Sequence, residues 1–348
     1  MTSSRVYLDH AATTPIRAEA KAAMAAALAD WHNPSSPHAE GRAARRTLEQ
    51  ARQRLADALG WTGEIVFTSG ATEALTIALR GAARPLVSAV EHDAVLRAAP
   101  GADTVPVDVN GLVTIGEGAL AGSRLAIQHV NNETGVIQPL HDLLSGSRSA
   151  GAIFVADCAQ SAGKLALPPA DLVAISAHKF GGPPGIGALL ARDLALIEAM
   201  GGQERGYRPG TENLPAILGM VAALEADRTW LDVMPGLRAT LDEAIVAAGG
   251  EIVAGRSERL STIAAYRMPG MAAQAQLVAF DLAGFAVSAG SACSSGSLKP
   301  GRVLPAMGWS AAAAGEVIRA SFGWTTTPDE VARFAETWTM LAQRRHAA

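Results

Sequence analysis

The sequence has little that would indicate a secreted, membrane or nucleic-acid-binding protein. Its two cysteines, Cys158 and Cys293, are too few for a disulfide framework and favour a reducing compartment. The opening MTSSRVYLDHAATTP lacks the apolar stretch of a secretory signal, and uncharged runs elsewhere are short or broken by Gly, Ser and Pro, which argues against a membrane span. No basic block occurs, and 29 Lys and Arg against 33 Asp and Glu give a net charge of −4, so direct binding to nucleic acid is not expected.

The composition is instead typical of a globular protein with more than one domain. Of the 348 residues, 49% are hydrophobic and 18% charged, which is enough apolar material for a large core and too much for a disordered chain. Hydrophobic cores tend to divide beyond about 250–300 residues. We therefore expect two domains, in a protein of the cytoplasm.

Short apolar runs alternate with longer segments rich in alanine and leucine in the first two thirds of the chain. This alternation is typical of βαβ units and predicts a mostly parallel sheet, with ligands gathered beyond the carboxyl ends of its strands. Residues 214–230 have the apolar period of a long helix. The expected strands are residues 64–67, 86–90, 125–130, 152–157 and 172–176.

A second, α+β domain is expected from about residue 232 onward. Residues 328–344 have the pattern of an amphipathic helix, which Thr327, Pro328, Asp329 and Glu330 would open. The expected strands in this part are residues 252–254, 262–268, 276–280 and 285–290.

Two clusters at the predicted strand ends could carry chemistry. The turn 68-TSGATE-73 leaves N–H groups free at a helix start, which suits phosphate, although Ser and Thr are also ordinary helix caps. Lys179 follows a strand and precedes the glycine-proline turn of 176-SAHKFGGPPGIG-187. An amine placed there can be desolvated and form a Schiff base; the alternative is a surface lysine.

Three polar residues end or follow the predicted strands nearby. Asp157 closes an apolar strand, where it could pair with a protonated pyridine nitrogen or cap the next helix. Gln160, three residues on, could reach the same ligand. His92 could stack on a flat ring or transfer protons, or be a structural hydrogen-bonding group.

The glycine- and serine-rich stretch 288-SAGSACSSGSLKPG-301 contains Cys293. Its composition predicts a mobile loop, and a cysteine on such a loop indicates a nucleophile rather than a packed side chain. Cys158, at a strand end, is expected to be packed. Arg319 lies among apolar residues and needs an anionic partner, either a substrate carboxylate or an internal Asp or Glu.

Taken together and in this order, these stretches resemble the class V aminotransferases and, among them, the cysteine desulfurases of nitrogen fixation and iron–sulfur assembly. The combination is far more specific than any one motif. The matching stretches are 8-LDHAATTP-15, 67-FTSGATEA-74, 91-EHDAVL-96, 129-HVNNETGVIQP-139, 157-DCAQSAGK-164, 176-SAHKFGGPPGIGAL-189, 210-GTEN-213, 288-SAGSACSSGS-297 and 318-IRASFGW-324.

The resemblance implies a fold-type I enzyme that uses pyridoxal 5'-phosphate. Residues 16–231 would form a large cofactor-binding domain, a mostly parallel seven-stranded sheet between helices, and residues 1–15 and 232–348 a smaller α+β domain with the cysteine loop. It implies that Lys179 holds the cofactor covalently, Asp157 pairs with its ring nitrogen, Gln160 contacts its phenolic oxygen and His92 stacks on the ring. The other residues it implies are Ala71, Thr72, Ser176, His178 and Thr211 (the last from a second subunit) around the phosphate, and Asn132 and Arg319 on the substrate.

The implied reaction removes sulfur from L-cysteine, giving L-alanine and a persulfide on Cys293, which passes to a thiol or scaffold acceptor for iron–sulfur cluster, cofactor or tRNA synthesis. Lys179 and His92 would transfer protons, and the enzyme would be a homodimer. Three alternatives stay open: a class V transaminase without a loop thiol, a selenocysteine lyase, and a cofactor-binding regulator without turnover.

Overall fold

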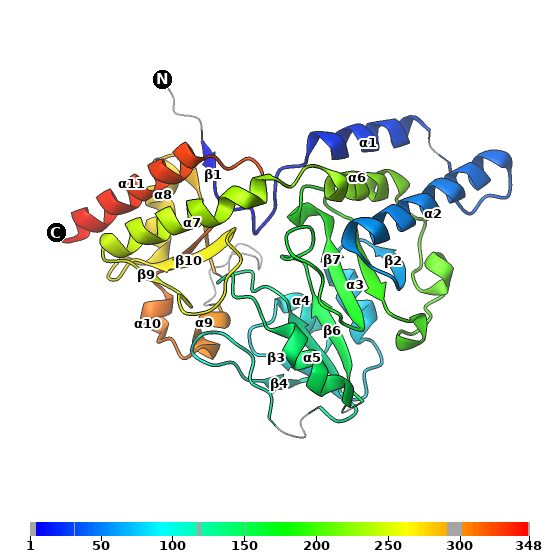
Figure 1. Cartoon of the computed structure of the whole chain (residues 1–348), viewed down its shortest axis with the longest axis horizontal. Coiled ribbons are helices and arrows are strands. Elements are labelled where there is room, and N and C mark those ends of the chain that lie inside the picture. Colours follow the sequence, from blue (N-terminus) through cyan, green and yellow to red (C-terminus); the bar gives the residue numbers. More distant parts are fainter. Residues whose placement is uncertain (1–4, 31, 117–119, 150, 291–300, 347–348) are drawn as a thin grey trace.

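The computed structural model describes residues 5–30, 32–116, 120–149, 151–290 and 301–346 (Figure 1). Its main element is a seven-stranded sheet of order β2-β8-β7-β6-β5-β3-β4, in which β8 runs against its two neighbours and the other paired strands are parallel. The strands are β2 (Glu64–Thr68), β3 (Pro85–Ser88), β4 (Asp103–Val105), β5 (Arg124–Gln128), β6 (Ile153–Asp157), β7 (Leu172–Ser176) and β8 (Gly187–Ala191).

Helices cover both faces of this sheet because both faces of its strands are apolar. In β2, for example, Ile65 and Phe67 face one hydrophobic cluster and Val66 faces the other. The first cluster includes side chains of α2 (Ala39–Leu59), α5 (Leu140–Ser149) and α6 (Leu214–Glu225), with α1 (Ala18–Ala29) packed on α6; the second includes α3 (Ala71–Leu79) and α4 (Asp93–Ala98). The fold is thus the α/β fold predicted from the sequence.

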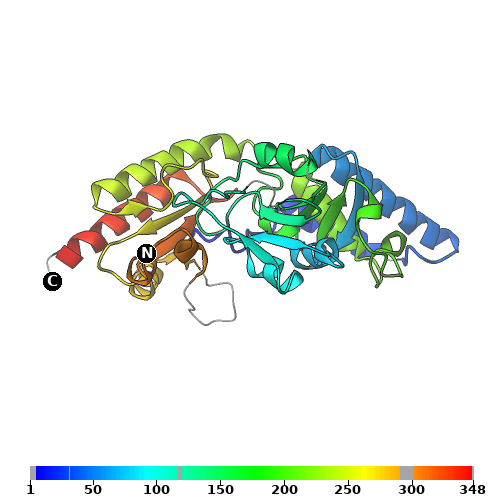
Figure 2. The ribbon, with the colours of Figure 1, turned by 90° about the horizontal axis from the view of Figure 1, so that it is seen from below.

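A smaller α+β part lies beside the large sheet (Figures 1 and 2). Its antiparallel sheet has the order β12-β13-β10-β9, and β1 pairs in parallel with β11. The buried rings of Phe280, Phe334 and Trp338 pack in its core. Its elements are β1 (Val6–Tyr7), α7 (Trp230–Ala247), β9 (Glu251–Ile252), β10 (Ile263–Arg267), α8 (Ala273–Leu282), β11 (Phe285–Ala286), β12 (Ser288–Ala289), α9 (Val303–Ala306), α10 (Ala311–Ala314), β13 (Val317–Ser321) and α11 (Pro328–His346).

Three predicted elements differ from the structure. The strand expected at 285–290 is two short strands, β11 and β12, which pair in different sheets. The strand expected at 276–280 is wrong, because these residues belong to helix α8, which buries Ala273, Gln276 and Phe280 at helical spacing. The helix expected over 214–230 ends at Glu225, and α7 begins at Trp230. The domain limits at residues 16 and 232 stay a prediction.

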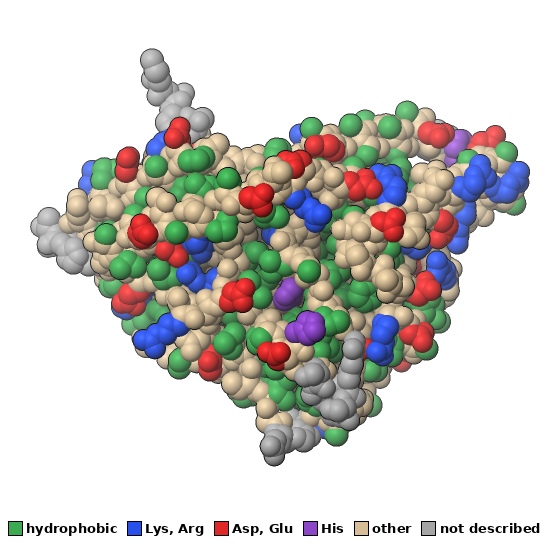
Figure 3. Space-filling model, in the orientation of Figure 1, with side chains coloured by type: hydrophobic (Ala, Val, Ile, Leu, Met, Phe, Trp, Pro, Cys, Tyr) green, Lys and Arg blue, Asp and Glu red, His purple; other side chains and the backbone are tan. Residues whose placement is uncertain are grey.

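No helix within the described ranges is long and apolar enough to cross a membrane. On the face shown in Figure 3, acidic and basic side chains are interspersed over most of the surface. The described surface on this side therefore presents no broad field of one sign.

Candidate active site

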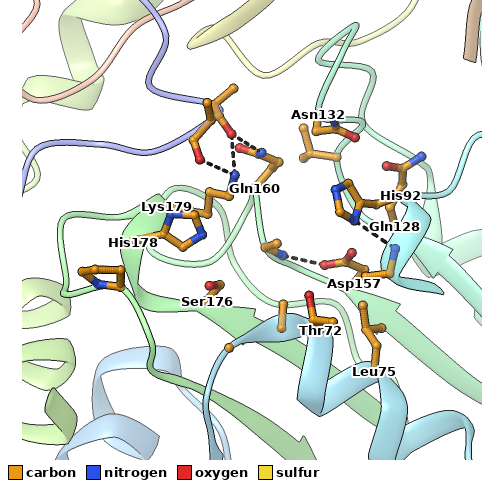
Figure 4. A pocket seen from close by; sticks show the side chains of 18 of the residues that line it. Thr72, Leu75, His92, Gln128, Asn132, Asp157, Gln160, Ser176, His178 and Lys179 are labelled. Carbon is orange, nitrogen blue, oxygen red and sulfur yellow. Dashed lines mark hydrogen bonds between the residues drawn. The ribbon is translucent and has the colours of Figure 1, made fainter. Parts of the chain in front are cut away.

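A cavity of about 360 Å³ lies where β5, β6 and β7 end (Figure 4). It falls within the size range of small-molecule sites and at the strand ends where α/β sheets bind ligands. Nine of the predicted site residues line it: Ala71, Thr72, His92, Asn132, Asp157, Gln160, Ser176, His178 and Lys179.

Lys179 is placed in this cavity by a single turn of 3₁₀ helix that follows β7. Its Nζ donates hydrogen bonds to the backbone oxygens of Ala11, at 2.6 Å, and Ala12, at 2.7 Å. Both alanines belong to the segment between β1 and α1. The amine is thus held at the cavity wall by two backbone carbonyl oxygens, which only accept hydrogen bonds.

Asp157 ends β6 and is buried, and its carboxyl accepts a hydrogen bond from the Ala159 N–H at 2.9 Å. Burial raises the pKa of its carboxyl, and His92 and Lys179 act in the opposite direction. Asp157 forms no ion pair within the described part of the chain. A cation entering the cavity would therefore stabilise the carboxylate.

His92 lies across the cavity from Lys179 and precedes α4 (Figure 4). Its Nδ1 accepts a hydrogen bond from the Ala94 N–H at 3.1 Å, which fixes the ring, and burial lowers its pKa. Since its Nδ1 accepts and its pKa is lowered, His92 is a neutral imidazole near pH 7, available to a ligand as a flat face or a proton donor and acceptor.

Gln160 has one satisfied and one unsatisfied amide atom. Its Nε2 donates to the Ala11 oxygen at 2.9 Å, while its Oε1 is buried without a hydrogen-bond partner among the described residues. An orphan buried oxygen in a cavity wall indicates that a bound ligand or water completes the group.

The opposite end of the cavity is formed by the start of α3. Gly70 precedes the helix with φ 151° and supplies no side-chain cap, and Ala71, Thr72 and Ser176 line the cavity beside it. A side chain at Gly187 would come within 2.7 Å of the Gly70 Cα, so β8 packs tightly against this turn. His178 also lines this cavity, and burial lowers its pKa to about 4. Uncapped N–H groups at a helix start suit an anion.

The structure does not bring every predicted residue into the cavity. Arg319 lies beside the cavity in β13 and is buried. Its Nη2 donates to Asp9 Oδ1 at 2.6 Å, and its Nη1 donates to the backbone oxygen of the cavity residue Asn132 at 2.9 Å. Thr211 is exposed and does not line it. Cys293 lies outside the described residues. Cys158 is fully buried, as predicted, and burial raises the pKa of its thiol.

Among the lining residues that were not predicted are Ala11, Ala12 and Gln128. The alanines act through backbone oxygens, which side-chain chemistry does not indicate, although the stretch 8-LDHAATTP-15 carries part of the family resemblance. Gln128 ends β5 as Asp157 ends β6, and this shared position was the available signal.

Comparison with known proteins gives one consistent family. The aminotransferase class-V model matches residues 6–334. A cysteine desulfurase of Cereibacter sphaeroides is 36% identical, over 95% of this chain and 94% of its own, and the cysteine desulfurase IscS of Dictyoglomus turgidum is 35% identical, over 94% and 91%. The crystal structure of a NifS-like protein from Rickettsia africae superposes with a TM-score of 0.88, at 30% identity, over 97% of this chain and 99% of that one. The chain therefore belongs to the class-V aminotransferase family and, within it, to the cysteine desulfurases of the NifS type.

Proposed function

We propose that this protein is a pyridoxal 5'-phosphate-dependent cysteine desulfurase, which converts L-cysteine to L-alanine and places the sulfur on Cys293 as a persulfide. The observation that carries the proposal is the meeting of three groups in one cavity: the amine of Lys179, the carboxyl of Asp157, which has no ion pair among the described residues, and the helix start at Ala71, which has no side-chain cap. Pyridoxal phosphate has a complementary aldehyde, ring nitrogen and phosphate.

The donor set fits this cofactor at each of its polar groups. Asp157 would hold the protonated ring nitrogen. This cation would stabilise the ionised carboxylate, which burial disfavours. The N–H groups of Ala71 and Thr72, with Ser176 and His178, would hold the phosphate. Gln160, with its unsatisfied amide oxygen, would complete its hydrogen bonds at the ring edge. When bound, the cofactor supplies an aldehyde for amines and a ring that withdraws electrons from the bound amino acid.

Lys179 and His92 are the groups placed to move protons. The Lys179 Nζ donates hydrogen bonds to two backbone carbonyl oxygens, which orient the amine. His92 is held by Ala94, and its lowered pKa leaves the ring neutral and able to accept a proton near pH 7.

Asn132 lines the cavity and would orient the substrate, and Arg319, which donates to the Asn132 oxygen, would hold the substrate carboxylate. For Arg319 to do so, the substrate must share or replace Asp9.

In the sulfur step, the thiolate of Cys293 would attack the sulfur atom of the substrate. A sulfur–sulfur bond forms, the carbon–sulfur bond breaks, and its electron pair stays with the carbon, which gains a proton to give alanine. The enzyme thiol and L-cysteine thus become an enzyme persulfide and L-alanine, with no external oxidant. A thiol acceptor, free or on a scaffold protein, would take the terminal sulfur. A second copy of the chain would offer Thr211 to the phosphate end.

The test is release of alanine and sulfide from L-cysteine by the purified holoenzyme in the presence of a thiol reductant. Lys179→Ala is expected to reduce turnover by about 10³-fold or more, because the amine both binds and transfers protons. Cys293→Ser is expected to abolish sulfide release, whereas Cys158→Ser, at the fully buried thiol, leaves it within about twofold.

Sulfide release that survives Cys293→Ser would refute the persulfide step. Amino-group transfer from L-cysteine to a keto acid, without sulfide, would favour the transaminase alternative. A large preference for selenocysteine over cysteine would favour the lyase.

A further inference from the structure

The turn that leads into α3 is attached on its outer side to one loop, residues 203–210. Strand β2, which enters the turn, is an edge strand of the seven-stranded sheet, paired only with β8. The Phe67 N–H donates to Glu204 Oε2 at 2.8 Å, and the Ile65 oxygen accepts from Arg52 Nη1 at 2.7 Å. An ion pair therefore satisfies backbone groups on β2 that a further strand would otherwise pair.

This ion pair is buried and bidentate. Arg52 Nη1 lies 2.7 Å from Glu204 Oε2 and Nη2 lies 3.1 Å from Oε1, with side chains 8% and 1% exposed. The guanidinium also lies 4.7 Å from the centre of the Phe67 ring. A pair so enclosed by backbone and ring contacts fixes both of its ends.

A second ion pair joins the same loop to the helix itself. Arg208 Nε donates to both carboxylate oxygens of Glu73, at 3.0 and 3.2 Å, and Glu73 Oε2 accepts the Ser69 N–H. Glu73 lies in the first turn of α3, next to Ala71 and Thr72. The arginine also neutralises a carboxylate that would otherwise repel an anion at this helix start.

The loop adopts an unfavourable backbone conformation between these two attachments. Glu204 and Arg205, neither of them glycine, have φ values of 48° and 57°. Consecutive left-handed residues of this kind each cost about 1–2 kcal/mol and persist only where their surroundings hold them. The Arg52–Glu204 pair is such a constraint, and it acts on the loop and the strand end together.

We propose that Arg52–Glu204 and Arg208–Glu73 are positioning pairs, which hold the turn Thr68–Thr72 rigid so that its N–H groups are set for the phosphate of the cofactor. This inference rests on the proposed function. None of the four side chains lines the cavity, so each acts through the backbone of the turn. A rigid turn has no ordering cost to meet when the phosphate binds.

The test compares two ligands that differ only in the phosphate. The dissociation constants of pyridoxal 5'-phosphate and of pyridoxal are measured on the full-length apoprotein by absorbance titration. In Glu204→Gln, and in Arg52→Met/Glu204→Gln, which leaves no unpaired charge, we expect the first constant to rise about tenfold and the second by less than twofold. The control is Arg54→Met. Arg54 lies on the same helix as Arg52, and its exposed pair with Glu225 of α6 (2.8 Å) is broken by the substitution, which should alter neither constant.

A parallel rise in both constants would show a general structural role and would overturn the proposal, as would no change in either. Should the buried-pair variants fail to fold, Arg208→Gln at the half-buried pair is expected to raise the first constant about threefold with the same selectivity, and its failure to do so would equally overturn it. Wild-type protein that bound both ligands equally would instead refute the phosphate site of the proposed function.

Discussion

Two carboxyl groups of this molecule, the buried Asp157 and the partly exposed Asp9, have opposite electrostatic settings. Asp157, at the end of β6, is in no ion pair within the described residues, and burial raises its pKa. Asp9, beside the smaller sheet, is paired with Arg319 at 2.6 Å. The first lacks a cation, and the second already has one.

On the proposed function, this difference corresponds to a cofactor side and a substrate side of the site. The proposed cofactor side is made mainly by the ends of neighbouring strands in one sheet, and Lys179 and Gln160 also donate to backbone oxygens of the segment after β1. The proposed substrate side depends on Arg319 of β13. This arginine is paired with Asp9, and a substrate carboxylate would have to displace or share that partner. In the proposed site, the first side lacks a cation that the cofactor would bring, whereas the second would have to rearrange its charges when substrate arrives.

Among the changes that test this comparison, removing the charge of Asp157 should have the largest effect. Asp157→Asn keeps an oxygen for the Ala159 N–H but can no longer compensate a cation. We expect turnover of L-cysteine to fall about 10²-fold, equivalent to ~3 kcal/mol, together with weaker cofactor retention. Steady-state rates and the cofactor content after dialysis measure both effects.

The matched control is Asp171→Asn, at another buried aspartate, in the loop before β7 and away from the cavity. It is expected to lower the melting temperature, because Asp171 pairs with Arg192 and accepts the Phe154 N–H, but to leave the cofactor content of the folded protein unchanged. Full cofactor retention in Asp157→Asn would contradict the proposal that this carboxyl pairs with a cationic group of the cofactor.

Removing the charge of Asp9 should have a smaller effect, of the opposite sign. Asp9→Asn frees Arg319 from a competing carboxylate while keeping a neutral hydrogen-bond acceptor. We expect the KM for L-cysteine to fall about three- to tenfold, because a charged hydrogen bond contributes ~1–2 kcal/mol, with little change in kcat.

Initial rates over a range of cysteine concentrations measure this change, with Asp281→Asn, at the exposed pair with Arg5, as the control. A KM that rises instead would mean that Asp9 orients Arg319 rather than competing for it.

The contrast also explains which parts could be read from the sequence. Lys179, Asp157 and His92 each follow a predicted strand, and the parallel sheet brings such strand ends together, so local pattern was sufficient. The Asp9–Arg319 pair joins residues 310 positions apart, and no local pattern selects one acidic partner over another at that distance.

Two other misses have local causes. Ala11 and Ala12 act through carbonyl oxygens, which every residue has. In 276-QLVAF-280, leucine, valine and phenylalanine suggested a strand. The segment is helical instead, because a helix buries Gln276 and Phe280 on one face.

The smallest effect concerns a third carboxyl, Glu91, next to His92 on the cofactor side. It is buried and accepts the Gln128 N–H at 2.9 Å, and burial, with the nearby Asp157, raises its pKa from 4.5 to about 8. As the pH rises from 4.5 toward 8, the unfolded chain loses this proton while the folded chain retains it, so wild-type stability falls across that interval. Glu91→Gln cannot ionise and should lose less stability. Its melting temperature relative to wild type should increase between pH 5 and pH 8 by about 1–2 °C for each kcal/mol of this linkage, given the length of the chain. Thermal unfolding at both pH values measures the change, with Glu19→Gln at an exposed helix position as the control. An unchanged difference between variant and wild type at the two pH values would mean that Glu91 is ionised in the fold, and the cofactor side would then carry a second uncompensated charge beside Asp157.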